Sequence, residues 1–279
     1  MRIVEYDPSR RADVAELMSR VWGERPDERE LEWFYEQNPV RPASVLLGEG
    51  DDGRVIATVA IAFQRMCIGG EELEVGMPLR VATDPAQRGK GIFATLEAEN
   101  ESRVAALGIR LLLTVPNAAS APVFLRRLDW SELPSLRVWA RPHVLRPRPR
   151  TSVVDRFTGF APERYAGDRV LRDTSWLNWR FADSPRPYTL LAGDGYAVVG
   201  KRGRVGVAAV VEGPLLGDVA AVARGAAVIA APAPWERRRY ALAGYLPTQR
   251  TFTVLGKALV PGQPVPRQPH FELGDLDFF

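Results

Sequence analysis

The sequence contains a single cysteine, Cys67, and only two histidines, His143 and His270, among its 279 residues. One cysteine excludes an intrachain disulfide, and the position of Cys67 at the end of an apolar run predicts a small buried side chain. Structural zinc sites draw on several Cys and His ligands at close spacing. These counts argue against such a site, and we predict no metal.

Lysine is also scarce, with Lys90, Lys201 and Lys257 as the only examples, so arginine carries most of the positive charge. The basic residues are spread along the chain without interleaved aromatic residues, which argues against a nucleic-acid partner. No run approaches the ~20 apolar residues of a membrane span. The N-terminal MRIVEYDPSRR also lacks the apolar core of a signal peptide. We therefore expect a cytoplasmic protein without a membrane partner.

Apolar periodicity predicts an alternation of helices and strands in the first half of the chain. A helix follows Asp7-Pro8, and its apolar face is expected to be buried. The residues of that face are Val14, Leu17, Met18, Val21 and Trp22. Further helices are predicted at 27–37, 91–107 and 119–128, and strands at 2–6, 44–48, 54–68, 72–83, 109–115 and 132–140. Pro78 favours a bulge or an edge position in its strand. This order predicts an α/β (α+β) fold with a mixed, mostly antiparallel sheet flanked by helices.

An internal repeat links the two halves of the chain. Leu31-Glu32-Trp33-Phe34-Tyr35 precedes Pro39, and Leu177-Asn178-Trp179-Arg180-Phe181 precedes Pro185. Each is followed by an apolar strand and then by a Gly-Arg-Val that opens another. The matching order predicts a duplication. The second copy has no glycine-basic-glycine loop opening a helix within 213–225; it resumes with a strand at 227–231, a helix at 234–243 and a strand at 249–259.

Domain boundaries follow from composition. Residues 145–150 alternate proline and arginine, which is typical of an extended linker. We therefore expect one domain at 1–144, a degenerate copy at 151–259, and a Pro-rich segment with an acidic, aromatic tail at 260–279. Phe271, Phe278 and Phe279 favour docking of this tail, and Asp275 and Asp277 favour contact with arginines. A solvated, disordered tail is the alternative.

The stretch 81–93 carries the strongest functional signal. A strand ends, Gly89 and Gly91 flank a basic residue, and a helix begins. Glycines let successive backbone N–H groups turn into one concavity, and a helix start adds unpaired N–H groups. Such a loop binds a diphosphate. Arg88 and Lys90 add positive charge.

Residues 1–142 resemble the GCN5-related N-acetyltransferase superfamily, whose signature is Gln/Arg-x-x-Gly-x-Gly/Ala. Arg88 and Gly91 match its first two fixed positions, and Phe93 departs from the third. The resemblance implies that acetyl-CoA is the cofactor and that strands 79–83 and 109–115 splay apart to admit its pantetheine arm. Asn117 is either a cofactor contact or a helix cap. The remaining implied cofactor-binding residues are Val81, Ala82, Thr83, Arg88, Gly89, Lys90, Gly91, Ile92 and Phe93.

The second half extends the resemblance to a bacterial group of tandem two-domain members of this superfamily. The residues that carry it are Trp176 to Phe181 and the terminal Gly-Asp-x-Asp. We expect Trp179 and Arg180 to be core and interdomain residues rather than catalytic ones.

The resemblance implies direct transfer, in which a deprotonated amine attacks the thioester carbonyl and a thiolate leaves. The backbone N–H of Val81 would polarise that carbonyl. The usual acid is a tyrosine ahead of a Gly-aromatic pair; Asp129-Trp130 stands in for the pair, so the tyrosine position falls on Leu125. A thiol has a pKa of ~8.5, so its thiolate can leave without full protonation.

Base candidates are carboxylates. Glu72 and Glu74 lie on the strand leading to the loop, where they act as base or are simply solvated. The terminal carboxylate of Phe279 is a further candidate.

Three functions remain to be compared. The first is an N-acyltransferase acting on the amine of a small molecule or peptide, and the second is an acyl-CoA-binding regulatory protein with little turnover. A peptidoglycan-type aminoacyl transferase also pairs two such domains, but it usually lacks the coenzyme A loop. The acceptor, the acyl chain and a homodimeric assembly are left open by the sequence.

Overall fold

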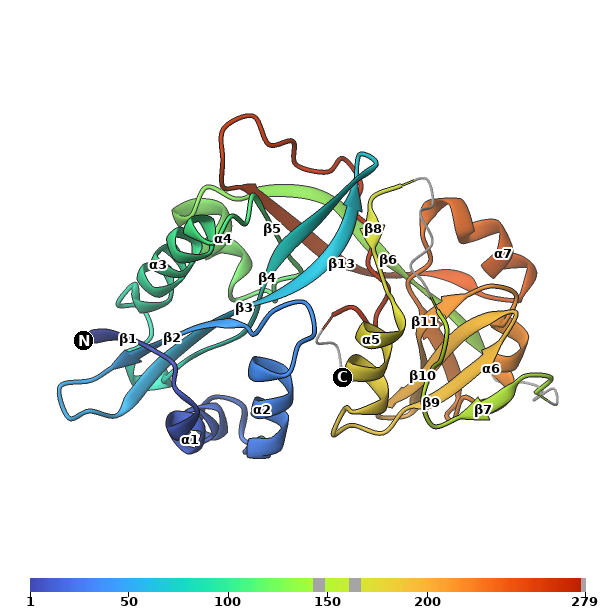
Figure 1. Cartoon of the computed structure of the whole chain (residues 1–279), viewed down its shortest axis with the longest axis horizontal. Coiled ribbons are helices and arrows are strands. Elements are labelled where there is room, and N and C mark those ends of the chain that lie inside the picture. Colours follow the sequence, from blue (N-terminus) through green and yellow to red (C-terminus); the bar gives the residue numbers. More distant parts are fainter. Residues whose placement is uncertain (143–148, 161–166, 277–279) are drawn as a thin grey trace. The chain divides into compact units, whose positions relative to one another are not determined.

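The computed structural model describes residues 1–142, 149–160 and 167–276 (Figure 1). His143, most of the expected linker, and Asp277, Phe278 and Phe279 lie outside the described residues. The chain divides into two compact units. Unit 1 comprises Met1–Met66, Glu71–Leu133 and Val254–Pro266; unit 2 comprises Cys67–Gly70, Pro134–Thr253 and Arg267–Phe279.

Both units are discontinuous in sequence, unlike the contiguous domains expected at 1–144 and 151–259. The reason is that two long strands, β6 (Ser131–Pro142) and β13 (Leu246–Ala258), each contribute one end to unit 1 and the other end to unit 2. Local sequence patterns do not report pairing between strands so far apart along the chain.

Unit 1 is built on a mixed sheet in the order β1-β2-β3-β4-β5-β13. The pairs β1–β2, β2–β3 and β5–β13 are antiparallel, whereas β4 and β5 are parallel. The bounds are β1 (Arg2–Glu5), β2 (Ser44–Glu49), β3 (Val55–Ile68), β4 (Glu71–Thr83) and β5 (Leu111–Thr114).

Helices cover both faces of this sheet. α1 (Arg11–Trp22) and α2 (Glu28–Glu36) lie on one face, and α3 (Ile92–Ala106) and α4 (Ala121–Arg127) lie on the other (Figure 1). Short 3-10 turns, η1 (Pro8–Arg10) and η2 (Pro85–Gln87), precede α1 and α3. Val14, Leu17 and Met18 are buried as predicted, but Trp22 is 48% exposed at the last position of α1, so its expected burial is wrong.

The irregularity expected at Pro78 lies within the sheet. β4 lies between β3 and β5, so the edge alternative is wrong. Arg80 has a φ of 52°, in the left-handed region that non-glycine residues rarely adopt. The strand is therefore locally distorted just before the glycine loop, as a bulge would require.

The strands of unit 2 are ordered β13-β6-β12-β11-β10-β9-β7, and β11 and β12 are parallel. Its strands are β7 (Ser152–Val154), β9 (Thr189–Gly193), β10 (Gly195–Arg202), β11 (Val205–Glu212) and β12 (Ala227–Ala230), with the two-residue β8 (Arg169–Val170). Its helices are α5 (Thr174–Leu177), the π-helical turn η3 (Asn178–Ala182), α6 (Leu216–Val222), η4 (Pro234–Glu236) and α7 (Arg237–Leu242). α6 and α7 lie on one side of the strands and α5 lies on the other (Figure 1).

The two units repeat one order of elements. The series α2-β2-β3-β4-α3-β5-α4 in unit 1 corresponds to α5-β9-β10-β11-α6-β12-α7 in unit 2. Both series contain one parallel pair, β4–β5 with Gly76 opposite Leu112, and β11–β12 with Gly206 opposite Val228. This order supports the predicted duplication. The helix α6, which sequence reasoning missed within 213–225, takes the place of α3.

Candidate functional site

The glycine loop of unit 1 is fixed at its base by Asp84. Its carboxylate accepts a hydrogen bond from the backbone N–H of Ala86 at 3.0 Å, and its own N–H donates to Ile56 O at 2.8 Å. The hydrogen bond from Ala86 holds the pKa of Asp84 below its usual value, and the guanidinium of Arg20, 2.9 Å away, acts in the same direction. The loop therefore starts from a rigid turn.

Two left-handed glycines shape the rest of the loop. Gly89 and Gly91 have φ angles of 79° and 78°. A Cβ at Gly89 would meet open space, so the backbone there can approach a ligand closely. The first backbone hydrogen bond of α3 runs from Thr95 N to Gly91 O. The N–H groups of the first turn, before Thr95, therefore have no carbonyl partner within the helix. This arrangement suits a diphosphate.

Charged side chains flank the loop from two elements. Arg88 and Lys90 are exposed, and Lys90 Nζ donates to Gln87 Oε1 at 2.8 Å. Arg127, at the end of α4, was missed by sequence reasoning: its Nη1 lies 3.5 Å from the position of a Cβ on Gly91. The only sequence signal was the pair Arg126-Arg127 at the end of a predicted helix. Arg127 thus adds a guanidinium beside the start of α3.

Phe93, the departure from the signature, has a partner on α4. Its ring meets that of Phe124 edge to face at a centroid distance of 5.3 Å. Phe124 in turn packs against Trp130 at 4.8 Å. Asp129 adopts a φ of 55°, a conformation that glycine adopts readily, which supports the prediction that Asp129-Trp130 stands in for a Gly-aromatic pair.

The end of β4 holds Val81, Ala82 and Thr83, beyond the part of the strand that pairs with β5. The parallel ladder between the strands lies at Gly76 and Leu112. Further along, the contact is made by a side chain instead, since Thr114 Oγ1 donates to Pro78 O at 2.9 Å. This change supports the expected opening between the strands, which stays a prediction.

Asn117 has the contacts of a cap. Its Oδ1 accepts from the backbone N–H groups of Ala119 and Ser120 at 2.9 and 3.0 Å, just ahead of α4. A cofactor contact by Asn117 stays a prediction.

The two glutamates predicted as bases form ion pairs with arginines, and the residue at the predicted acid position cannot donate a proton. Glu72 forms an ion pair with Arg65 at 3.3 Å, and Glu74 forms one with Arg41 at 2.7 Å. Leu125 lies on α4 and is 37% exposed, and its aliphatic side chain offers no proton.

The sequence did not predict a partly buried ion pair formed by Arg80, the residue before Val81. Arg80, at the distorted point of β4, donates from Nη2 to Glu30 Oε1 on α2 at 2.6 Å. The guanidinium also stacks on the ring of Phe34, 4.3 Å from its centroid. Glu30 is thereby held beside the end of β4. No local pattern pairs these residues, because they belong to different elements.

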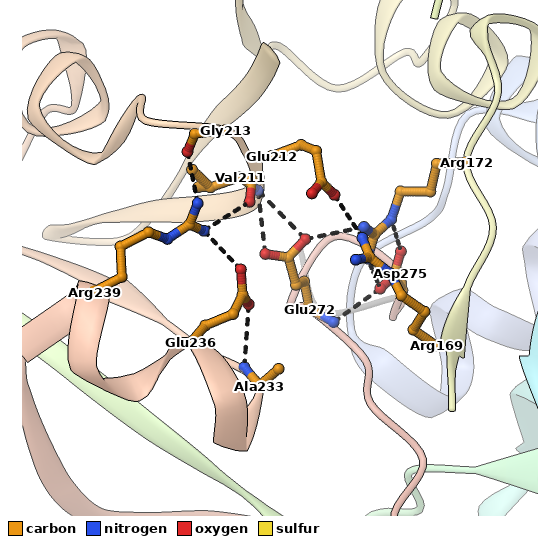
Figure 2. Close-up of polar contacts among 10 residues, drawn as sticks. All are labelled: Arg169, Arg172, Val211, Glu212, Gly213, Ala233, Glu236, Arg239, Glu272 and Asp275. Atoms are coloured by element: carbon orange, nitrogen blue, oxygen red, sulfur yellow. Dashed lines mark hydrogen bonds and ion pairs between the residues drawn. The ribbon is translucent and has the colours of Figure 1, made fainter. Parts of the chain in front are cut away.

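In unit 2, the end of β11 corresponds to the end of β4 but has different hydrogen-bond partners. Val81 and Val211 each lie five residues after the glycine that pairs with the parallel strand. The N–H of Val211 donates to the carboxyl group of Glu272 at 3.1 Å (Figure 2). The N–H of Gly274 donates to Ala209 O at 2.8 Å. The loop after β11 is only Gly213-Pro214-Leu215. The chain's own tail therefore occupies this region of unit 2.

A buried charge network holds that tail in unit 2 (Figure 2). Arg172 binds Asp275 through two hydrogen bonds and Glu272 at 3.2 Å. Arg180 donates to the carbonyl oxygens of Gly274 and Leu276. The expected docking of the tail is thus confirmed for residues 270–276, as is the contact of Asp275 with an arginine. Trp179 and Arg180 are buried, in agreement with their predicted core role.

One cluster in the described residues has the composition of a metal site. Glu236, His270 and Glu272 offer ligand atoms within 4.8 Å of one another. However, Glu236 is paired with Arg239 and Glu272 with Arg172, so arginines already supply the positive charge. Burial, with help from Arg172, Arg169 and Arg237, lowers the pKa of His270 to about 3. We assign this cluster to anchoring the tail.

Comparison with known proteins gives a family for unit 1. Residues 2–133 match the model of the acetyltransferase (GNAT) domain. The chain matches no curated protein sequence. Within the described ranges, no helix has the length and apolar character needed to cross a membrane.

Several solved structures share the fold of the whole chain. A GCN5-related N-acetyltransferase from Anabaena variabilis has a TM-score of 0.67 and 10% identity, covering 93% of this chain and 73% of its own. One from Kribbella flavida has a TM-score of 0.65 and 16% identity over 92% and 72%. Eis1 from Mycobacterium abscessus has a TM-score of 0.63 and 14% identity over 93% and 74%.

Proposed function

We propose that this chain, whose residues 2–133 match the acetyltransferase (GNAT) domain, transfers an acyl group from acetyl-CoA to the amine of a small molecule or peptide. The observation that carries the proposal is the loop between β4 and α3. It has two glycines in the left-handed conformation, followed by the N–H groups of the first helical turn, which have no partner within the helix. Such a loop offers donors without a competing carboxylate at its tip.

The residues of unit 1 divide the binding of the coenzyme. The N–H groups from Arg88 to Phe93 would hold the diphosphate, and the Arg127 guanidinium beside Gly91 would add a charge-assisted hydrogen bond. The acyl-pantetheine arm would follow β4 past Thr83, Ala82 and Val81. Acetyl-CoA supplies the activated thioester, and the chain supplies its position.

For the acyl transfer we assign the Val81 N–H to the thioester oxygen, where a preorganised donor stabilises the charge that develops. Glu72 and Glu74 remain candidates for the base, although both are paired with arginines. Glu30 is a further candidate, paired with Arg80, the residue before Val81. With Leu125 in the expected acid position, we propose that the thiolate leaves without a tyrosine donor.

The proposal is tested by Gly91→Glu, with Gly108→Glu as the matched control. Both glycines have a positive φ, 78° and 90°, and they bracket the same helix, so the two variants carry the same added charge and a similar backbone strain. We expect Gly91→Glu to abolish acetyl-CoA binding in calorimetry and Gly108→Glu to leave it unchanged. Equal affinities would refute the loop assignment.

Turnover separates the enzyme from a binding protein. Release of free coenzyme A thiol from acetyl-CoA is measured against a panel of primary amines. Amine-dependent release that Gly91→Glu removes supports acyl transfer. Binding without release for every amine would favour the regulatory alternative.

A further inference from the structure

A pocket of about 380 Å³ opens on unit 2. Its lining comes from β6, β13 and the first residue of α7. The residues are Ser135, Arg137, Trp139, Arg237, Pro247 and Thr251. Pockets for small molecules have volumes of about 300–1,000 Å³, so this one is of a size to hold such a ligand.

The strand pattern explains why these residues meet. Successive side chains of a strand point to opposite faces, so residues two apart share a face. Ser135, Arg137 and Trp139 alternate along β6, and Pro247 and Thr251 have the same parity along β13. Thr248 Oγ1 donates to Val138 O at 2.8 Å, which ties the two strands together. Five of the six lining residues thus lie on two paired strands, and Arg237 comes from α7.

The lining is rich in donors and contains no carboxylate. Arg137 and Arg237 bring two guanidinium groups, and Ser135 and Thr251 bring hydroxyls. Among the described residues no carboxylate forms an ion pair with either arginine. Two unneutralised guanidinium charges on one pocket favour an anion, and their fork geometry suits phosphate oxygens.

Trp139 adds an apolar wall. It is 8% exposed, and its indole packs into the core formed by α6, α7 and the strands. Its Nε1 has no hydrogen-bond partner among the described residues. Together with Pro247, the indole offers a surface for the organic part of a ligand.

We propose that this pocket binds a small organic phosphate monoester. The dianion, with a charge of about −1.5 to −2 at neutral pH, matches the two arginines. The ring or chain that carries the phosphate would lie against Trp139 and Pro247. The site is separate from the coenzyme loop of unit 1, and it is independent of the proposed acyl transfer.

Phenyl phosphate is the probe, titrated by calorimetry into the full chain, with benzoate as the carboxylate arm. Arg137→Gln and Arg237→Gln each remove one guanidinium from the pocket, and Arg238→Gln is the matched control. Arg238 is the next residue of the same helix, is equally classed as exposed, and does not line the pocket. Thermal melts verify that all three variants are folded, as expected for exposed positions.

We expect the two pocket variants to weaken phenyl phosphate binding by about tenfold or more each, because a charged hydrogen bond is lost. Arg238→Gln should bind as the unmodified chain does. The glycine loop of unit 1 also favours phosphate, so binding by the unmodified chain does not by itself locate the site. Weaker phenyl phosphate binding by Arg137→Gln and Arg237→Gln assigns it to this pocket. No binding, equal binding in all variants, or benzoate binding as tightly as phenyl phosphate would each overturn the proposal.

Discussion

Arg172 donates two parallel hydrogen bonds to the carboxylate of Asp275, one of them from Nε at 2.7 Å. The two residues are 103 positions apart in the sequence. Both side chains are almost completely buried. Since a buried charge is costly unless it is paired, each residue depends on the other. The pair therefore ties the C-terminal tail to unit 2.

Breaking this pair should destabilise unit 2. We expect Asp275→Ala to lower the free energy of unfolding by about 3–5 kcal/mol, because it leaves the Arg172 guanidinium buried with less compensation. The control is Asp183→Asn, which breaks the exposed pair with Arg156 and should change stability little. Urea denaturation measures both. A tail that is not anchored would leave Asp275→Ala as stable as the control.

Titration of Glu272 and His270 should contribute to the pH dependence of the free energy of unfolding. Burial raises the pKa of Glu272 from 4.5 to about 8. The charges of Glu236, Asp275 and Glu212 also raise this pKa, whereas the guanidinium of Arg172 lowers it. The folded state then binds a proton that the unfolded state does not, so this contribution falls as pH rises from 4.5 through 8. His270, with its pKa lowered to about 3 from 6.5, contributes stability above pH 6.5 that is lost as pH falls toward 3.

Two variants separate these contributions in denaturation curves taken at several pH values. Glu272→Gln keeps an acceptor but cannot ionise, so it should flatten the loss of stability between pH 6.5 and 8. His270→Gln should flatten the loss below pH 4.5. If the curves of both variants run parallel to that of the unmodified chain, these two groups do not govern the profile.

Arg127 should contribute to coenzyme binding although it lies outside the loop. Arg127→Gln is expected to raise the Kd for acetyl-CoA by about tenfold, the effect of losing one charge-assisted hydrogen bond. Arg126→Gln, its neighbour on α4 with similar exposure, is the control. Calorimetry on the two variants decides the point. A matching loss in both would indicate a general effect of positive charge.

Unit 1 should not fold without β13. Leu255 belongs to the core that contains Phe63, Val104 and Phe124, and Lys257 Nζ pairs with the buried Glu101 at 2.6 Å. We expect a fragment of residues 1–144 to be largely unfolded, because it loses core area and leaves Glu101 without its cation. Circular dichroism melts test this. Joining residues 254–266 to 1–133 through a flexible linker should restore a cooperative transition, and a cooperative melt of 1–144 alone would show that β13 is dispensable.

Much of the candidate site was accessible to sequence reasoning because its determinants are local. The cap by Asp84 spans two residues, the left-handed turns at Gly89 and Gly91 are built into those residues, and the start of α3 follows directly. The same holds for Asp129, whose stand-in for a glycine is a property of one backbone position. By contrast, Arg127 beside Gly91 and Glu30 beside Arg80 depend on how separate elements pack.

The sequence by itself determined most of the helices and strands of this protein, their order and the loop that marks its chemistry, because helix faces, strand alternation, caps and glycine turns are set by neighbouring residues. Only the tertiary structure decided that β13 completes unit 1 and that the tail fills the region of unit 2 equivalent to the proposed acyl site. Those contacts join residues more than a hundred positions apart, such as Arg172 with Asp275 and Lys257 with Glu101. Their pairing is selected by burial and charge compensation in the folded chain, which no local pattern records.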